Sequence, residues 1–307
     1  MKKNFIVAID LGGTNLKVAL LNSRYRILHK EILPTGNFIH KQDLIKGIVC
    51  AVKNILKSNR LCAKNILGLG VGVPGPVDIE AGRVYFLPNI PGWRDVPLKN
   101  ILNKILGMPV VVDNDAKLMC LAEHRLGAAK NTRNALCITL GTGVGGGLII
   151  GGKLYRGSSG AAGEIGHLPI NEGGARCNCG NRGCLETYIG NRNIMRQAKK
   201  VFKQLKSPEE LSRLAEQGNQ KALALWSGVG EHLGNALVGA VNILNPDCIV
   251  VGGGVSAAGK VLLDRVRRVV RKRAMSVQAK KVKILRAKLG NDAGLVGAAI
   301  LVKEISS

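Results

Sequence analysis

The chain has 307 residues, 46% of them hydrophobic, which is enough apolar material for a packed interior and for two lobes. No stretch approaches the ~18 apolar residues of a membrane span, and the short N-terminal apolar run is interrupted by Asp10. We therefore expect a cytoplasmic protein with no signal peptide and no membrane partner. The net charge of +25 predicts an attraction for anionic ligands.

The chain opens with a strand, a glycine turn and a returning strand, in the letters FIVAID, LGGTN and LKVALL. Residues 135 to 152, ALCITL-GTGVGG-GLIIGG, repeat this pattern. The run IDLG that begins at Ile9 aligns with the run ITLG that begins at Ile138. Two related hairpins that open two halves of a chain predict a duplicated, two-lobed architecture.

Helical and strand patterns alternate through the rest of the chain. Residues 41 to 57 have apolar residues at helical spacing, and ILGLGVGVPG then reads as a buried strand that enters a turn. The stretch MPVVVDNDAKLM reads as a strand followed by a helix, and GNDAGLVGAAILVKEI reads as a helix capped by Asn291 or Asp292. This alternation predicts an α/β protein with buried sheets. We expect one lobe over residues 1–117, to which a helix at 292–307 returns, and a second lobe over residues 118–291.

Glycine turns are the first candidates for ligand binding. Gly70 and Gly141 each begin a G-x-G-x-x-G pattern, but neither pattern opens a helix, so neither predicts a dinucleotide site of the common kind. Glycine hairpins can nevertheless hold phosphates, because their backbone N–H groups form anion-sized concavities. A tight turn would explain one such hairpin; two hairpins together with VGGGVS at 251–256 favour a nucleotide. Asp10 lies where it could position a metal ion or its water.

A carboxylate at a strand-to-helix junction is the candidate catalytic group. In PVVVDNDAKLM a buried strand ends near Asp113, and Asn114 and Asp115 follow. Ligands of open α/β sheets gather at the carboxyl ends of strands, where a carboxylate can accept the proton of an attacking hydroxyl. Helix capping is the alternative interpretation, because Asn and Asp perform it routinely.

Three of the eight cysteines lie in one loop, residues 163–187, that also contains Glu164 and Glu186. The spacing H-x9-C-x-C-x4-C, formed by His167, Cys177, Cys179 and Cys184, matches a closed tetrahedral zinc site. In a cytosolic chain such a cluster favours a metal over disulfides, and the other five cysteines are read as buried thiols. A filled shell predicts a structural zinc ion that orders the loop and its carboxylates.

A basic tract runs from Arg265 to Lys288, with eleven Lys and Arg residues and no acidic residue among them. A nucleic-acid or polyanion surface is one interpretation. The other is a solvated helix face above an apolar stripe that includes Leu262 and Val266. The absence of aromatic residues and of a nucleic-acid module favours the solvated face, so we expect no nucleic-acid partner.

The motifs DLGGTNLK, GVPGPVD, DNDA, GEIGH and CNCGNRGCLE together resemble the ROK family (repressors, open reading frames and kinases), in family order over nearly the whole chain. The resemblance implies an α/β fold of the actin/hexokinase-like (ribonuclease H-like) class, with two lobes and a homodimeric assembly. It also implies a kinase that phosphorylates a hexose from Mg-ATP, with structural Zn²⁺.

The resemblance also implies residue roles. Asp115 would be the general base for the 6-hydroxyl of the sugar, and His167 would bind zinc through one ring nitrogen and face the sugar with the other. The implied sugar contacts are Gly75, Asn89, Asn114, Asp115, Glu164, His167 and Glu186. The implied contacts to the nucleotide and its Mg²⁺ are Asp10, Gly12, Gly13, Thr14, Lys17, Gly141, Thr142, Gly143, Gly253 and Gly254.

Several alternatives stay open. The motifs look most like the glucokinases of the family, but N-acetylglucosamine and N-acetylmannosamine kinases share them, and some fructose and allose kinases do in part. Polyphosphate is a less favoured donor, because polyphosphate glucokinases generally lack the cysteine motif. A sugar-responsive repressor is the alternative from another class, and we expect no DNA-binding domain because the first strand begins by residue 4. A zinc-stabilised sugar binder without catalysis is disfavoured by Asp115 and the hairpins.

Overall fold

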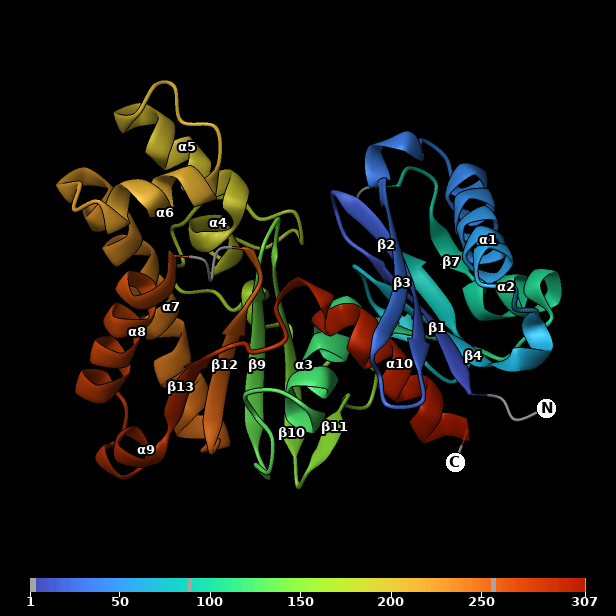
Figure 1. The fold of residues 1–307 in the computed structure, drawn as a ribbon. Helices are drawn as coiled ribbons and strands as arrows, with labels where there is room; N and C mark the ends of the chain where they lie inside the picture. Colours follow the sequence, from blue (N-terminus) through green and yellow to red (C-terminus); the bar gives the residue numbers. More distant parts are fainter. Residues whose placement is uncertain (1–3, 88–89, 255–257, 307) are drawn as a thin grey trace. The chain divides into compact units, whose positions relative to one another are not determined.

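The computed structural model describes residues 4–87, 90–254 and 258–306 (Figure 1). Its contacts divide the chain into two compact units. The first comprises Met1–Ala122, Arg156–Ala162 and Asp292–Ser307, and the second comprises Glu123–Tyr155 and Gly163–Asn291. The expected first boundary, residue 117, falls inside a helix, whereas the contacts change units after Ala122.

The first unit is built on a five-stranded sheet with the order β3-β2-β1-β4-β8. Its strands are β1 (Phe5–Leu11), β2 (Asn15–Asn22), β3 (Ile27–Pro34), β4 (Ile66–Val73) and β8 (Val110–Asn114). A three-stranded sheet joins β5 (Val77–Asp78), β6 (Arg83–Phe86) and β7 (Arg94–Val96). The helices are α1 (Lys41–Ser58), α2 (Leu98–Leu106), α3 (Asp115–Arg125), which continues across the boundary, and α10 (Ala293–Ser306).

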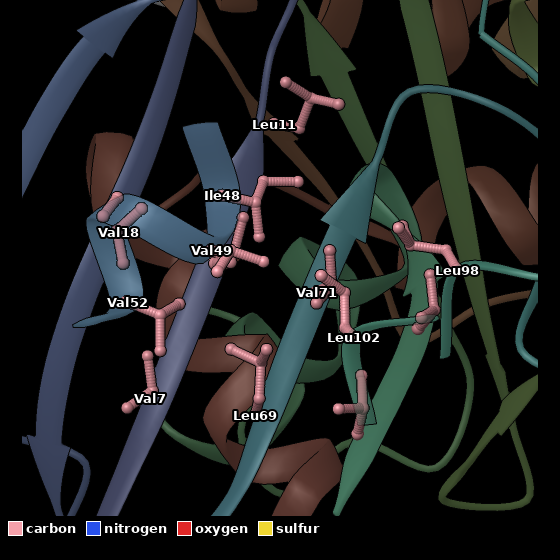
Figure 2. Packing of buried hydrophobic residues seen from close by; sticks show 14 of the residues in the cluster. Val7, Leu11, Val18, Ile48, Val49, Val52, Leu69, Val71, Leu98 and Leu102 are labelled. Atoms are coloured by element: carbon pink, nitrogen blue, oxygen red, sulfur yellow. The ribbon is translucent and has the colours of Figure 1, made fainter. Parts of the chain in front are cut away.

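Helices pack on both faces of this sheet. The apolar stripe of α1, which includes Ile48 and Val52, packs with Val7, Val18 and other strand residues in one buried cluster (Figure 2). The helix α10 contacts β1 and β4. A Cβ added at Gly70 would lie 2.3 Å from the carbonyl oxygen of Ala298, so the glycines of β4 let the α10 backbone approach closely. The expected C-terminal helix therefore packs on the first unit.

The second unit repeats this plan with a sheet of order β11-β10-β9-β12-β13. Its strands are β9 (Ala135–Leu140), β10 (Val144–Ile150), β11 (Lys153–Tyr155), β12 (Cys248–Gly252) and β13 (Lys283–Arg286). Its helices are α4 (Glu186–Ile189), α5 (Asn191–Val201), α6 (Pro208–Glu216), α7 (Gln220–Leu244), α8 (Gly259–Arg273) and α9 (Ser276–Lys281).

The two sheets confirm the predicted duplication. In each, a hairpin of antiparallel strands (β1–β2 and β9–β10) is followed by a parallel neighbour (β4 and β12). The carboxyl ends of the parallel strands lie at the same end of each sheet, so the segments that follow these strands lie close together. Within the described residues, no helix is long and apolar enough to cross a membrane.

Candidate functional site

The β1–β2 hairpin of the first unit presents an exposed tip. The Gly12 N–H donates to the carbonyl of Asn15 at 2.8 Å, and Thr35 holds the turn from outside through its hydroxyl, which donates to the carbonyl of Gly12 at 2.9 Å. Gly13 and Thr14 are exposed. The turn is therefore fixed by a backbone hydrogen bond and by the Thr35 hydroxyl, while the two exposed residues Gly13 and Thr14 remain accessible to a ligand.

Asp10 lies beneath this tip, opposite Lys17 in the antiparallel register, and accepts a hydrogen bond from its ammonium at 2.9 Å. A Cβ added at Gly294 would lie 2.7 to 3.0 Å from atoms of the Asp10 carboxylate. The carboxylate thus approaches the first turn of α10, where the helix dipole favours negative charge. Asp10 and Lys17 form a preset pair of charges next to the glycine turn.

Asn114 connects the end of β8 to its surroundings. Its side-chain oxygen accepts the N–H groups of Ala116 and Lys117, each at 3.1 Å, and its amide nitrogen donates to the carbonyl of Gly75 at 3.2 Å. Asn114 therefore caps α3 and fixes the Gly75 turn, which is the capping role that its position in the sequence allowed. The neighbouring Asp115 begins α3 and accepts the N–H of Ala116 at 2.8 Å. The candidate sugar contact Asn89 lies outside the described residues.

A largely buried ion pair between Arg156 and Asp113 stabilises the junction between β8 and α3. Two guanidinium nitrogens of Arg156, Nε and an Nη, donate to one carboxylate oxygen of Asp113 at 3.1 and 2.8 Å. The Asp113 side chain is only 3% exposed, and its other oxygen accepts the N–H of Asn114 at 2.8 Å. Charge-assisted pairs of this kind hold geometry strongly, so Arg156 stiffens the backbone immediately before Asp115.

In the second unit, the turn Gly141–Gly143 connects β9 to β10 and lies against Glu186. The Val144 N–H donates to the Glu186 carboxylate at 2.8 Å, and a Cβ at Gly143 would lie 2.5 Å from the same carboxylate. Only glycine at position 143 therefore leaves room for Glu186 in this place. The structure brings together a predicted sugar contact and a predicted phosphate turn, and the exposed Gly253 and Gly254 follow the parallel strand β12.

Gly253 must be a glycine for two reasons. Its φ of +84° lies in the left-handed region, and a Cβ there would lie 2.2 Å from the carbonyl oxygen of Leu140. The turn after β12 thus packs on Leu140 at the end of β9. Leu140 directly precedes the Gly141–Gly143 turn in the chain. The two glycine turns of the second unit consequently share one edge of its sheet.

The loop after β11 gathers the predicted metal ligands. The ligand atoms of His167, Cys177, Cys179 and Cys184 all lie within 4.8 Å of one another. The Sγ of Cys177 is 3.7 Å from Nδ1 of His167, and the Sγ atoms of Cys179 and Cys184 are 3.6 Å apart. A tetrahedral zinc ion with Zn–S bonds of ≈ 2.3 Å requires edges of about 3.8 Å. The four residues therefore fit a closed tetrahedral zinc site.

The thiols of this cluster differ in proton affinity. Burial raises the pKa of Cys184 to about 12 and also raises the pKa of Cys177. The backbone N–H of Asn181 lowers the pKa of Cys179. Metal binding needs thiolates, so a metal that enters this cluster must displace protons, above all from Cys184.

Glu164 precedes, and His167 ends, a short 3-10 turn, Ile165–His167, that packs on β10. A Cβ at Gly166 would lie 2.1 Å from the carbonyl oxygen of Val144, so this turn touches the strand backbone directly. Because His167 faces Cys177 with Nδ1, its Nε2 is directed away from the cluster. Glu164 is exposed at the start of the turn.

Sequence reasoning missed two side chains that fix backbone segments, Arg156 in the first unit and Glu123 in the second. Arg156 follows β11 with no recognisable motif around it, and only the structure shows that it contacts Asp113. Glu123 is fully buried in α3, and its carboxylate accepts the N–H groups of Ala128, Lys288 and Leu289 at 2.7 to 3.1 Å. The sequence offers no clear signal for a buried acceptor here, because Glu123 is followed by His124 and Arg125 at the polar end of the helix.

The chain is similar to proteins of known kind over its whole length. The model of the ROK family matches residues 6–305. A glucokinase of Halalkalibacterium halodurans is 37% identical, over 99% of this chain and 96% of that protein. A xylose repressor of Caldicellulosiruptor bescii is 31% identical over 97% of this chain and 77% of its own length.

A solved structure gives the same result for the fold. A ROK family glucokinase from Streptomyces griseus, in complex with glucose and AMPPNP, superposes with a TM-score of 0.85 at 32% identity and covers 98% of this chain and 99% of that one. This likeness to a solved ROK kinase confirms the expected actin/hexokinase-like α/β fold. The motifs, the duplicated sheets and the family match together place this chain in the ROK family.

Proposed function

We propose that the protein is an ATP-dependent hexose kinase that transfers the γ-phosphoryl group of Mg-ATP to the 6-hydroxyl of glucose. The observation that carries the proposal is the placement of Asp115 at the carboxyl end of β8, on a junction fixed by Asn114 and by the Asp113–Arg156 pair. The glucokinase relatives support the reaction and favour glucose as the sugar.

Asp115 would accept the proton of the sugar 6-hydroxyl as its oxygen attacks the γ-phosphorus and the bond from that phosphorus to the β-phosphate oxygen breaks, releasing ADP. The carboxylate already accepts the N–H of Ala116, which directs it without neutralising it. Phosphoryl transfer depends on alignment and charge neutralisation more than on covalent chemistry. A rigid junction before Asp115 therefore matters as much as its basicity.

The glycine turns would hold the phosphates through their backbone N–H groups. In the first unit, these are Gly12, Gly13 and Thr14; in the second, Gly141, Thr142 and Gly143. Mg²⁺ that accompanies ATP would supply charge neutralisation, and Asp10 is the residue that would hold it or its water. Lys17 would contribute a positive charge, and Gly253 and Gly254 would adjoin the adenosine.

Sugar hydroxyls would meet Glu164, Glu186 and the Nε2 of His167. Zinc, when bound to the cluster, would supply a structural crosslink and fix the tautomer of His167. The fit of the ligand spacing to a tetrahedron supports zinc as the resident metal. Asn114 would act on the sugar mainly through the Gly75 turn that it holds.

The zinc proposal has its own test. A Cys179→Ser variant is expected to lose zinc, measured by metal analysis, and to bind glucose at least several-fold more weakly in calorimetry, although residue 179 is not among the proposed sugar contacts. Cys62→Ser, outside the cluster, is the matched control and should change neither quantity. Cys62 and Cys50 are exposed, so the expectation that all five cysteines outside the cluster are buried is wrong for these two. Unchanged glucose affinity in a folded, zinc-free Cys179→Ser protein would contradict the link between metal and sugar.

The reaction is tested by ADP release from Mg-ATP with glucose, mannose, fructose, N-acetylglucosamine and N-acetylmannosamine. Activity confined to glucose supports the proposal. A preference for an N-acetylated sugar would retain the kinase and replace the substrate. No activity with any sugar would refute the kinase and favour the alternative below.

A sugar-responsive regulator is the second candidate, because the chain is 31% identical to a xylose repressor across 97% of its own length. A regulator would bind a sugar without ATP turnover, so sugar binding in calorimetry combined with no ADP release identifies it. We further propose a homodimer, which light scattering of the purified protein would detect.

A further inference from the structure

Exposed apolar side chains gather at one end of the second unit. Ile243, in the last turn of α7, is 83% exposed, and Met275 and Val277, at the start of α9, are 63% and 64% exposed. The Met275 N–H donates to the side-chain oxygen of Asn242 at 2.9 Å, so these segments are neighbours. We call Ile243, Met275 and Val277 the apolar tip. Of the other large apolar side chains in the described chain, Ile39 alone reaches this exposure, at 64%, and it belongs to the first unit.

Cations flank Met275 and Val277 of the apolar tip along the chain. The helix α8 ends in Arg271, Lys272 and Arg273, and α9, which follows it in the chain (Figure 1), ends in Lys280 and Lys281. All five residues are exposed. This is the middle of the basic tract that the proposed kinase reaction does not use.

Three of these cations, Arg271, Lys280 and Lys281, also line a cavity of about 350 Å³ formed by α8, α9 and β13. Its charged lining residues are Arg267, Arg271, Lys280, Lys281 and Lys283, and no acidic residue lines it. Arg267 is already engaged, because it donates to the carbonyl of Ile284 and pairs with Asp264. Among the described residues, no ion pair involves the other four cations, so they keep their charge for a ligand.

Besides Asp264, which pairs with Arg267, a second acidic residue, Asp247, lies near the cavity. The Lys283 N–H donates to the carbonyl of Asp247, and the Asp247 carboxylate accepts the N–H groups of Arg133 and Asn134, each at 2.9 Å. The lining itself carries five cationic side chains and no acidic one, so its net charge is positive.

Three occupants differ in how well they match this surface. A nucleic acid would satisfy the cations, but it would leave Ile243, Met275 and Val277 in water and would find no aromatic side chain on α8 or α9 for stacking. A second copy of the same face would oppose cations to cations across a two-fold axis. An anionic lipid surface satisfies both features, because apolar side chains enter the acyl boundary while Lys and Arg meet the headgroup phosphates.

We propose that this end of the second unit docks on anionic phospholipid membranes, with headgroup phosphates at the basic cavity and the apolar tip inserted beside them. The binding is peripheral and needs no membrane-spanning helix. It combines two weak signals, charge and apolar insertion, as stable surface anchoring requires.

The two signals predict separable effects. Each Lys or Arg close to an anionic surface raises partitioning about fivefold, so Lys280→Gln/Lys281→Gln is expected to weaken binding about 25-fold. Met275→Ser/Val277→Ser removes part of the inserted apolar area and is expected to weaken binding about tenfold. All four side chains are exposed, so the fold is expected to tolerate both changes.

The experiment is co-sedimentation of the full chain with phosphatidylcholine vesicles, with and without phosphatidylglycerol, at about 0.1 M and about 0.5 M salt. Two matched controls separate a docking surface from general charge attraction. Lys199→Gln/Lys200→Gln removes two exposed lysines from the end of α5, and Ile39→Ser removes an equally exposed apolar side chain from the first unit.

The proposal expects binding only to vesicles that contain phosphatidylglycerol, weaker at high salt, reduced in both test variants and within about twofold of the parent in both controls. Equal losses in the lysine variants would refute a localised surface. An unchanged Met275→Ser/Val277→Ser variant would refute insertion. Tighter binding to duplex DNA than to vesicles, abolished by Lys280→Gln/Lys281→Gln, would replace the membrane with a nucleic acid.

Discussion

Removing the guanidinium of Arg156 should lower the free energy of unfolding of the first unit. The Asp113 side chain is 3% exposed and Arg156 is 25% exposed, and the two nitrogens of Arg156 donate to the same carboxylate oxygen. Loss of one partner of a buried ion pair costs about 3–5 kcal/mol, because the remaining charge is buried without compensation. Since Arg156 is one quarter exposed, water can enter the space it leaves, and the Asn114 N–H still serves the carboxylate. We therefore expect Arg156→Ala to lower the free energy of unfolding by about 2–3 kcal/mol.

The two tryptophans allow this loss to be assigned to a unit. Trp93 is buried in the first unit and Trp226 in the second. In a Trp226→Phe background, tryptophan fluorescence during urea unfolding reports the first unit alone, and Trp93→Phe provides the converse measurement. Arg156→Ala should lower the urea midpoint of the Trp93 signal.

Two further variants test the electrostatic reason. Adding Asp113→Asn to Arg156→Ala removes the uncompensated charge and should recover about 1 kcal/mol or more. Lys30→Ala breaks the exposed Lys30–Asp292 pair of the same unit, whose partners are 34% and 35% exposed, and should cost at most about 1 kcal/mol. A loss for Arg156→Ala no larger than that for Lys30→Ala, or one seen only in the Trp226 signal, would refute the reasoning.

Three other changes have defined outcomes. Gly143→Ala forces the Glu186 carboxylate from its place and should lower the thermal midpoint by several degrees, whereas Gly141→Ala, with nothing within 4 Å of the added carbon, should barely change it; equal effects would contradict the packing described. Glu123→Ala leaves three part-buried N–H groups without their acceptor and should cost about 2–3 kcal/mol in urea unfolding, with Glu123→Gln intermediate because one oxygen remains; a neutral Glu123→Ala would overturn this role. Without metal, burial holds the folded pKa of Cys184 at about 12, above its ordinary 9.0, so its contribution to the free energy of unfolding is complete below pH 9 and is lost as the pH rises toward 12. The lowered pKa of Cys179 acts in the opposite direction, but only below pH 9, outside that window. Urea midpoints of metal-free protein should fall across that window and those of zinc-loaded protein should fall less; identical profiles would contradict it.

Local patterns predicted the duplicated hairpins and the metal cluster well. The IDLG and ITLG runs lie at equivalent turns of two sheets with the same strand order, because each pattern encodes one strand and its glycine turn. The cysteines and His167 converge because their spacing confines them to a single loop. The expected helix at 41–57 is α1, Lys41–Ser58.

Contacts between distant segments could not be read from the letters. Arg156 and Asp113 are separated by 43 residues, and no periodicity relates them. The sequence allowed Asn114 either capping or sugar contact, and only the structure shows that both ends of its amide are engaged at α3 and Gly75. The sequence indicates a solvated face for the basic tract, but it does not predict the apolar tip beside it. The exposure of Met275 and Val277 and their proximity to α7 depend on the turn after α8, which no local pattern encodes.

The proposed reaction depends most on Asp115 as the base for a sugar hydroxyl. The direct measurement is the rate of glucose 6-phosphate formation by Asp115→Asn compared with the parent, with the affinities for glucose and ATP measured separately. We expect kcat to fall by roughly 10²–10⁴-fold while both affinities stay within a few-fold, because Asn keeps the shape and cannot accept the proton. Product formation at a rate close to that of the parent would contradict the central claim.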